Sequence, residues 1–191
     1  ITGDFIGNSA TSDGGAIYNG YNSTIGNIIG DFIGNTAYSD GGAIFNYGTI
    51  GNITGDFIGN TAYSEGGAIL NSSNSTIGNI TGDFIGNTAY SGGGAIDNSG
   101  TIENVTGDFI RNSSSAGGAI YNYKSTIGDI TGDFISNTAS YYGGAIYNDY
   151  DSTIGDITGN FISNTAFYHG GAIYNKGKIG NITGDFIGNT S

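Results

Sequence analysis

Acidic side chains recur at one fixed place along this sequence of 191 residues, always after a Gly. The column consists of Asp4, Asp31, Asp56, Asp83, Asp108, Asp133 and Asp185, and Asn160 takes its remaining place. If equivalent residues stack about 5 Å apart, these carboxylates repel one another and attract cations such as Ca²⁺. Alternatively, each side chain caps backbone N–H groups at a solvated corner, which Asn160 does equally well without a charge. We expect no metal and no other cofactor, and keep Ca²⁺ along the Asp column as the alternative.

Threonine forms two further columns: Thr24, Thr49, Thr76, Thr101, Thr126 and Thr153, and then Thr54, Thr81, Thr106, Thr131, Thr158 and Thr183. Regular Thr rows on a flat β-face resemble those of ice-binding solenoids, so an antifreeze role is the alternative function. Against it, Lys178 and Ile29 interrupt the rows, an Asn corner separates them, and Thr favours strands in any protein.

Aromatic residues recur beside the phrase Gly-Gly-Ala-Ile. The residue after this Ile is Leu70 or Asp97 in two repeats and is aromatic in the other five, as Tyr18, Phe45, Tyr121, Tyr147 and Tyr174. Strand alternation points these rings away from an inward Ile, and the loops nearby contain Tyr38, Tyr63, Tyr90 and Tyr168. We predict a binding ribbon that stacks on sugar rings or on a second copy of the chain. The alternative is that Tyr merely packs well along a β-face.

Catalysis finds little support in the residue types. His169 is the only His, and its loop position holds Asp13, Asp40, Glu65 or Tyr142 in other repeats. Sugar-cleaving β-helices need carboxylates with a basic partner in an irregular site, whereas the four basic residues here are scattered among similar repeats. We expect no enzymatic activity and no catalytic residue.

Composition argues against two classes of partner. The net charge of −12 disfavours nucleic acid and anionic membranes, which are bound through clustered Lys and Arg. No apolar run approaches the roughly 20 residues that span a bilayer, so we expect no membrane insertion by this segment. The absence of Cys removes disulfides and thiolate metal sites.

A repeat positions all of these residues. The phrase Phe-Ile-x-Asn begins at Phe5 and recurs at spacings of 27, 25, 27, 25, 25, 27 and 25 residues, and Gly-Gly-Ala-Ile-x-Asn falls once between neighbours. A fixed period of this size indicates a solenoid, whose units bury their apolar faces only against one another. The 38 Gly, the absence of Pro and the abundance of Ile, Thr, Tyr and Phe favour strands and turns over helices.

Each repeat contains three pieces of the form Ile-x-Asn, such as those that begin at Ile50, Ile58 and Ile69. Residues two apart face the same side of a strand, so each Ile can point inward and each Asn can turn the chain and bond to its copy in the next coil. We therefore predict an all-β solenoid with three short strands per coil, a triangular cross-section and about seven coils, roughly 35 Å long. The predicted corner Asn ladder is Asn8, Asn35, Asn60, Asn87, Asn112, Asn137 and Asn164.

The same alternation predicts interior columns of Ile. They are Ile6, Ile33, Ile58, Ile85, Ile110, Ile135 and Ile162, and then Ile17, Ile44, Ile69 and Ile96. Strict alternation would leave Phe5 and its equivalents outside, as an apolar ribbon that soluble monomers seldom expose. A kink after the Thr-Gly-Asp corner would turn each Phe inward instead. We expect the Phe column to be buried, either in the core or under a neighbouring segment.

The two motifs together resemble the repeat of the chlamydial polymorphic outer membrane proteins and of similar adhesin-like surface proteins, as in Phe32-Ile33-Gly34-Asn35 followed by Gly41-Gly42-Ala43-Ile44. The resemblance covers nearly all of the chain. It implies a right-handed parallel β-helix on the outside of a cell, often the passenger of an autotransporter, with a structural or adhesive role as a stalk or filament. The expected partners are other copies or adjoining repeats, surface glycans, or host proteins. Because both ends fall within a repeat, we expect residues 1–191 to be one solenoid segment of a longer protein.

Overall fold

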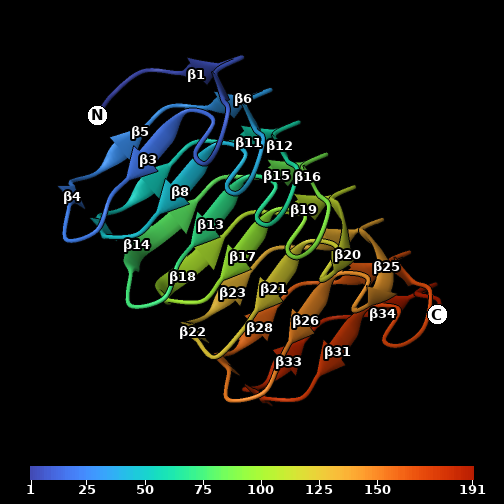
Figure 1. Cartoon of the computed structure of the whole chain (residues 1–191). Coiled ribbons are helices and arrows are strands. Elements are labelled where there is room, and N and C mark those ends of the chain that lie inside the picture. The colour runs from blue at the N-terminus through green and yellow to red at the C-terminus, as the bar shows by residue number, and fades with distance from the viewer.

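The computed structural model describes all residues, 1–191, as a parallel β-solenoid without helices (Figure 1). Its short strands stack along one axis, and the two termini lie at opposite ends of the stack. Two of its sheets contain seven strands, one from each of seven coils. The all-β solenoid of about seven coils that the repeat predicts is therefore confirmed. No helix long and apolar enough to cross a membrane is present.

Each coil contributes to four sheets, which we name after their residues. The Phe sheet contains β1 (Phe5–Ile6), β6 (Phe32–Ile33), β11 (Phe57–Ile58), β15 (Phe84–Ile85), β19 (Phe109–Ile110), β24 (Phe134–Ile135), β29 (Phe161–Ile162) and β34 (Phe186–Ile187). The Thr-Ala sheet contains β2 (Ser9–Ala10), β7 (Thr36–Ala37), β12 (Thr61–Ala62), β16 (Thr88–Ala89), β20 (Ser113–Ala116), β25 (Thr138–Tyr142) and β30 (Thr165–Ala166).

The other two sheets complete the coil. The Ile-x-Asn sheet contains β3 (Ile17–Asn19), β8 (Ile44–Asn46), β13 (Ile69–Asn71), β17 (Ile96–Asn98), β21 (Ile120–Asn122), β26 (Ile146–Asn148) and β31 (Ile173–Asn175). The Thr-row sheet contains β4 (Thr24–Ile25), β5 (Ile28–Ile29), β9 (Thr49–Ile50), β10 (Ile53–Thr54), β14 (Thr76–Thr81), β18 (Thr101–Thr106), β22 (Thr126–Ile127), β23 (Ile130–Thr131), β27 (Thr153–Ile154), β28 (Ile157–Thr158), β32 (Lys178–Ile179) and β33 (Ile182–Thr183).

The predicted count of three strands per coil is wrong. The Thr-Ala pair that follows each corner Asn forms a ladder of its own, which adds a fourth sheet. The piece that begins at Ile50 continues into Ile53 and Thr54, and both parts pair within the Thr-row sheet. In β14 and β18 the two parts form one unbroken strand of six residues, so this side of the coil is the longest.

Neighbouring coils pair in parallel with equivalent residues aligned, as Phe57 does with Phe84. The difference between coils of 25 and 27 residues falls mainly in the corner loop between the Ile-x-Asn and Thr-row sheets. In the longer loops Asn22, Asn74 and Asp151 adopt left-handed backbone with φ of 58°, 63° and 57°. Asn and Asp tolerate this conformation better than most residues, which lets the loop lengthen without a shift of the strands.

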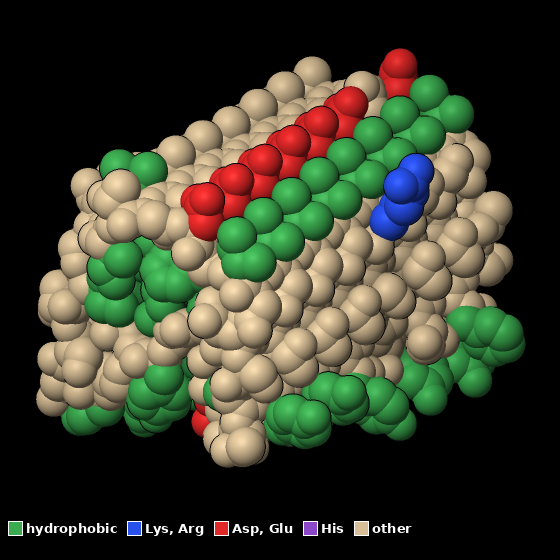
Figure 2. Space-filling view, turned by 90° about the horizontal axis from the view of Figure 1, so that it is seen from above, with side chains coloured by type: hydrophobic (Ala, Val, Ile, Leu, Met, Phe, Trp, Pro, Cys, Tyr) green, Lys and Arg blue, Asp and Glu red, His purple; other side chains and the backbone are tan.

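The core assignment of the first predicted Ile column is wrong, because Phe and not Ile points inward. Phe32 and its equivalents through Phe161 are buried, whereas the Ile residues that follow them lie on the outer face: Ile6, Ile33, Ile58, Ile85, Ile110, Ile135 and Ile162. The residue after each Ile causes the difference. It has a left-handed φ, 63° at Gly7 and 53° at Arg111, so the chain turns there and brings the following Asn inward as well. Figure 2 shows a row of hydrophobic side chains beside a row of acidic ones on the surface.

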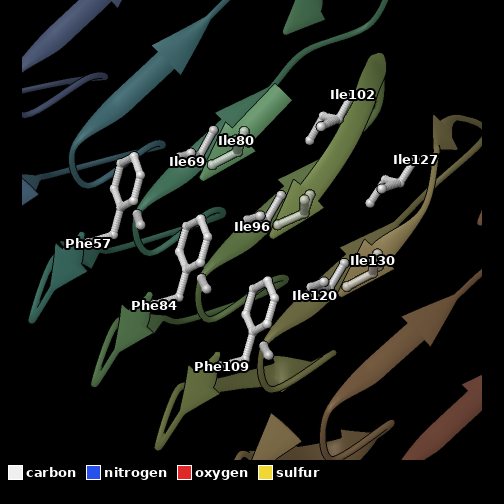
Figure 3. Packing of buried hydrophobic residues seen from close by; sticks show 14 of the residues in the cluster. Phe57, Ile69, Ile80, Phe84, Ile96, Ile102, Phe109, Ile120, Ile127 and Ile130 are labelled. Atoms are coloured by element: carbon white, nitrogen blue, oxygen red, sulfur yellow. The ribbon is translucent and has the colours of Figure 1, made fainter. Parts of the chain in front are cut away.

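Inward side chains from three of the sheets fill the core (Figure 3). The Phe rings stack from Phe5 to Phe186 with centroids 4.5–4.8 Å apart and ring planes within 11° of parallel. Facing them are the Ile residues of the Ile-x-Asn sheet, where Ile17, Ile44, Ile69 and Ile96 are all buried. The Thr-row sheet adds inward pairs such as Ile77 and Ile80. Each layer therefore buries its apolar side chains against the layers above and below.

Two ladders of buried Asn line the interior corners. In the predicted ladder, from Asn8 to Asn164 and on to Asn189, each Nδ2 donates to Oδ1 of the next coil at 2.9–3.0 Å. The second N–H of this amide donates to the Phe carbonyl of the preceding coil at 2.7–2.9 Å. A second ladder runs from Asn19 to Asn175 with amide contacts of 2.7–2.9 Å. These buried amides are thus satisfied along the axis.

Candidate functional site

The Asp column caps the backbone of its own stack. The Oδ1 of each residue from Asp4 to Asn160 accepts a hydrogen bond from the backbone N–H of its counterpart in the next coil, at 2.7–3.0 Å. Asn160 occupies the same position, accepts the N–H of Asp185 and donates through Nδ2 to Asp133. Nowhere in the chain do three or more acidic, His or Cys side chains converge in a group that could hold a metal ion.

Both Thr columns lie on the outer face of the Thr-row sheet. Thr49 and Thr54 are exposed while Ile50 and Ile53 between them are buried, and the same holds along the stack. The two rows therefore share one sheet, separated by a row that contains Asn52, Asn79 and Asn104 and then Asp129 and Asp156. The Asn position is a point on this face and not the sharp corner that the sequence analysis predicts.

The predicted aromatic ribbon is not a continuous exposed surface, and this expectation is corrected. Tyr18 is 56% exposed, but Tyr147 is only 6% exposed, and Phe45, Tyr121 and Tyr174 are partly buried. The loop that enters the Ile-x-Asn sheet folds over the ribbon. In the last coils Tyr142 packs on Tyr174 with centroids 5.0 Å apart, and His169 stacks on both rings.

Lys176 also contacts the ribbon in these last coils. Its Nζ donates to the hydroxyl of Tyr147 at 2.7 Å and lies 3.7 Å from a carboxylate oxygen of Asp149. It also lies 4.8–5.2 Å from the ring centroids of Tyr147, Tyr150 and Tyr174. The hydrogen bond to Tyr147 raises the pKa of Lys176, so its charge persists at all physiological pH values. These aromatic rings therefore already contact an internal cation.

Asp97 occupies a ribbon position as a buried carboxyl group. It is 2% exposed, its register partners are Leu70 and Tyr121, and its Oδ2 has no hydrogen-bond partner. Burial raises the pKa of Asp97 well above its usual range, and the charges of Glu65 and Asp40 raise it further. The free-energy cost of a buried, unpaired carboxylate explains the direction of the shift.

The exposed aromatic face lies one sheet away, on the outer side of the Thr-Ala sheet. Tyr38, Tyr63 and Tyr90 directly follow β7, β12 and β16, and they are 62%, 60% and 79% exposed. The rings of Tyr38 and Tyr63 stack in parallel, with centroids 5.1 Å apart. From the sequence, these residues are expected only to be loop neighbours of the ribbon. The alternation Thr-Ala-Tyr, with a small buried Ala between two outward side chains, is the signal that could have found this face.

Comparisons with known proteins agree with the repeat. The Chlamydia polymorphic membrane protein repeat matches the chain five times, at residues 3–20, 31–47, 55–72, 81–99 and 132–149. Each match spans a Phe strand, a Thr-Ala strand and an Ile-x-Asn strand, and omits most of the Thr-row sheet. No curated protein and no solved structure matches the chain.

Proposed function

Because this chain is built from repeats of the Chlamydia polymorphic membrane protein family, we propose that it serves as an adhesive structural element at the cell surface. It acts by contact with a surface, a glycan or another copy of itself, and turns over no substrate. A parallel stack suits this role, because hydrogen-bonded ladders along the whole axis make a stiff rod whose outer faces repeat at every coil.

The exposed row Tyr38, Tyr63 and Tyr90 is the observation that supports adhesion most directly. A Tyr ring has an apolar face and a polar tip, and it loses little conformational entropy on binding, so it is well suited to a contact surface. Nothing in the fold requires rings at this place, since Ser115 and Ser140 occupy it in later coils. With a net charge of −12, the rod favours neutral or basic partners over anionic ones.

Replacement of these three rings tests the proposal. The variant with Tyr38, Tyr63 and Tyr90 all changed to Ser is expected to lose at least tenfold in retention on cell surfaces, with an unchanged circular dichroism spectrum. A matched control changes Tyr21 and Tyr47, two exposed rings in a corner loop, to Ser. Equal retention of the parent, the variant and the control would remove this face as the adhesive surface.

Ice binding is a second candidate, favoured by the placement of both Thr rows on one sheet. Parallel rows of hydroxyl and methyl groups on a flat face are the feature that such a function uses. The interrupting charges Asp129, Asp156 and Lys178 weigh against it. Thermal hysteresis in the parent, lost on changing Thr81, Thr106 and Thr131 to Lys, would establish this function in place of adhesion. Absence of hysteresis at millimolar protein would exclude it.

A further inference from the structure

The exposed aromatic row is interrupted in the fifth coil. The chain there reads Ser113-Ser114-Ser115, and the next coil continues with Ser140 in place of a ring, so the row breaks off at Tyr90 and resumes only at Phe167. This coil is also one residue shorter between its Asn and its Gly-Gly, since Asn112 precedes Gly117 by five residues and other coils use six. The shortening appears as a shift of register between β20 and β25, at Ser114 and Ala116.

The serines are held in place by the backbone. The hydroxyl of Ser115 donates to the carbonyl of Tyr90 at 2.6 Å. The hydroxyl of Ser114 is within 2.9 Å of the carbonyls of both Ala116 and Gly117. Ser114 and Ser115 are therefore held in place before any ligand binds, and such preorganisation lowers the entropy lost on binding.

A groove of about 460 Å³ results, and its volume is within the range of small-ligand sites. Tyr63 and Tyr90 border it on one side and Tyr141 on the other, with hydroxyl groups of Ser113, Ser115 and Ser140 between them. Tyr141 is 48% exposed and is supported from behind by Tyr168, whose ring lies nearly parallel at 5.6 Å. No charged side chain lines the groove.

We propose that this groove binds a neutral oligosaccharide, with a sugar ring placed against Tyr90 and Tyr141 where the regular row lacks an aromatic ring. The proposal rests on the adhesive function and assigns it a ligand class and a site. Tyr90 and Tyr141 come from coils two steps apart, which is about 10 Å along the axis. A sugar ring midway between the two Tyr rings would lie at about half this distance from each, which is the usual separation of stacked rings. The C–H faces of a sugar pack on Tyr, and its hydroxyls bond to the Ser row. An acidic rod selects against anionic sugars.

The test measures binding of chitohexaose and cellohexaose by calorimetry and by shifts of the Tyr ring resonances. Both are neutral chains with flat C–H faces, and a heparin hexasaccharide serves as the charged comparison. Ser115→Tyr refills the groove and restores the row, so we expect at least a tenfold loss of affinity although the face gains a ring. Tyr90→Ser is expected to lose a similar factor, and Tyr21→Ser, in the corner loop, is the control that keeps parental affinity.

The outcomes separate this site from adhesion in general. If Ser115→Tyr binds either probe as well as or better than the parent, the groove is not the site, and the exposed rings act as an unselective face. If the parent binds neither neutral probe at 10 mM, the groove proposal is overturned, while retention of the parent on cells still decides the adhesive function by itself. Tighter binding of the heparin hexasaccharide than of the neutral probes would overturn the assigned ligand class.

Discussion

Phe84 and Ile85 are neighbours in one short strand, yet only Phe84 lies in the core. Phe84→Ala leaves a gap in the ring column and is expected to lower the free energy of unfolding by about 3–5 kcal/mol. Ile85→Ala removes a partly exposed side chain and should cost less than about 1.5 kcal/mol. Urea denaturation of the two variants measures the difference. A larger loss for Ile85→Ala than for Phe84→Ala would reverse the inward assignment.

Asp97 makes the stability of the fold depend on pH, and its contribution falls as the pH rises. Its folded pKa is raised, so its contribution to stability is complete below the pKa of the unfolded chain and is lost as pH rises through the folded pKa. Asp97→Leu copies Leu70 in the preceding coil, and we expect it to stabilise the protein by at least about 1 kcal/mol at pH 7 and by less at pH 4.

Melting curves at both pH values check this expectation. Asp108→Asn, in the half-buried acidic column that Asn160 also occupies, is the matched control and should change the melting temperature little at either pH. Destabilisation of Asp97→Leu at pH 7 would contradict the prediction, because it would mean that the carboxylate makes a favourable interaction in the folded chain.

At the scale of an element, an Asn→Ala change should lower the free energy of unfolding more in the buried Asn ladder than in the exposed row that contains Asn52, Asn79 and Asn104. The Oδ1 of Asn112 accepts from the backbone N–H and Nδ2 of Asn87, and its Nδ2 donates to Asn137 and to the Phe84 carbonyl. Asn112→Ala leaves buried groups on both sides unpaired and should cost at least about 3 kcal/mol. Asn104→Ala, in the solvent-exposed ladder, should cost less than about 1 kcal/mol, because water replaces the lost partners.

Chemical denaturation of these two variants separates a continuous buried ladder from a set of independent turn residues. Similar, small losses of unfolding free energy for both variants would show that the interior amides contribute no more than surface ones.

The long strands β14 and β18 are a second feature at the scale of an element. Their six-residue pairing makes the sheet most extensive in the middle of the stack.

For the whole molecule, the capping role of the Asp column predicts stability without a divalent metal. Melting in EDTA is expected to differ from melting in Ca²⁺ by less than about 2 °C, which corresponds to about 0.5 kcal/mol for a chain of this size. The reason is that Oδ1 of each Asp from Asp4 to Asp133 already accepts a backbone N–H, and Asn160 serves in the same position. A fall of many degrees in EDTA that Ca²⁺ reverses would instead assign the column to metal binding.

Much of the architecture follows from the sequence alone, because a strict repeat places equivalent residues at equivalent positions of every coil. The period, the Asn positions and the alternation around Ile17, Ile44 and Ile69 predict a β-solenoid with interior Asn and Ile columns, and short-range strand geometry is enough to derive them. The Asn of the Phe-Ile-x-Asn phrase points inward, as expected.

Only the tertiary structure decides which way Phe and Ile face and which aromatic rings remain exposed. Alternation fails at the left-handed residue after Ile, and this conformation cannot be inferred from residue type, because Arg111 and Ser136 adopt it as well as Gly7. The ribbon at Tyr147 is covered by Tyr142 and Lys176, which lie at neighbouring positions only after the loop folds back. The groove beside Tyr90 depends on a one-residue shortening in one coil, whose effect exists only relative to the coils stacked on either side.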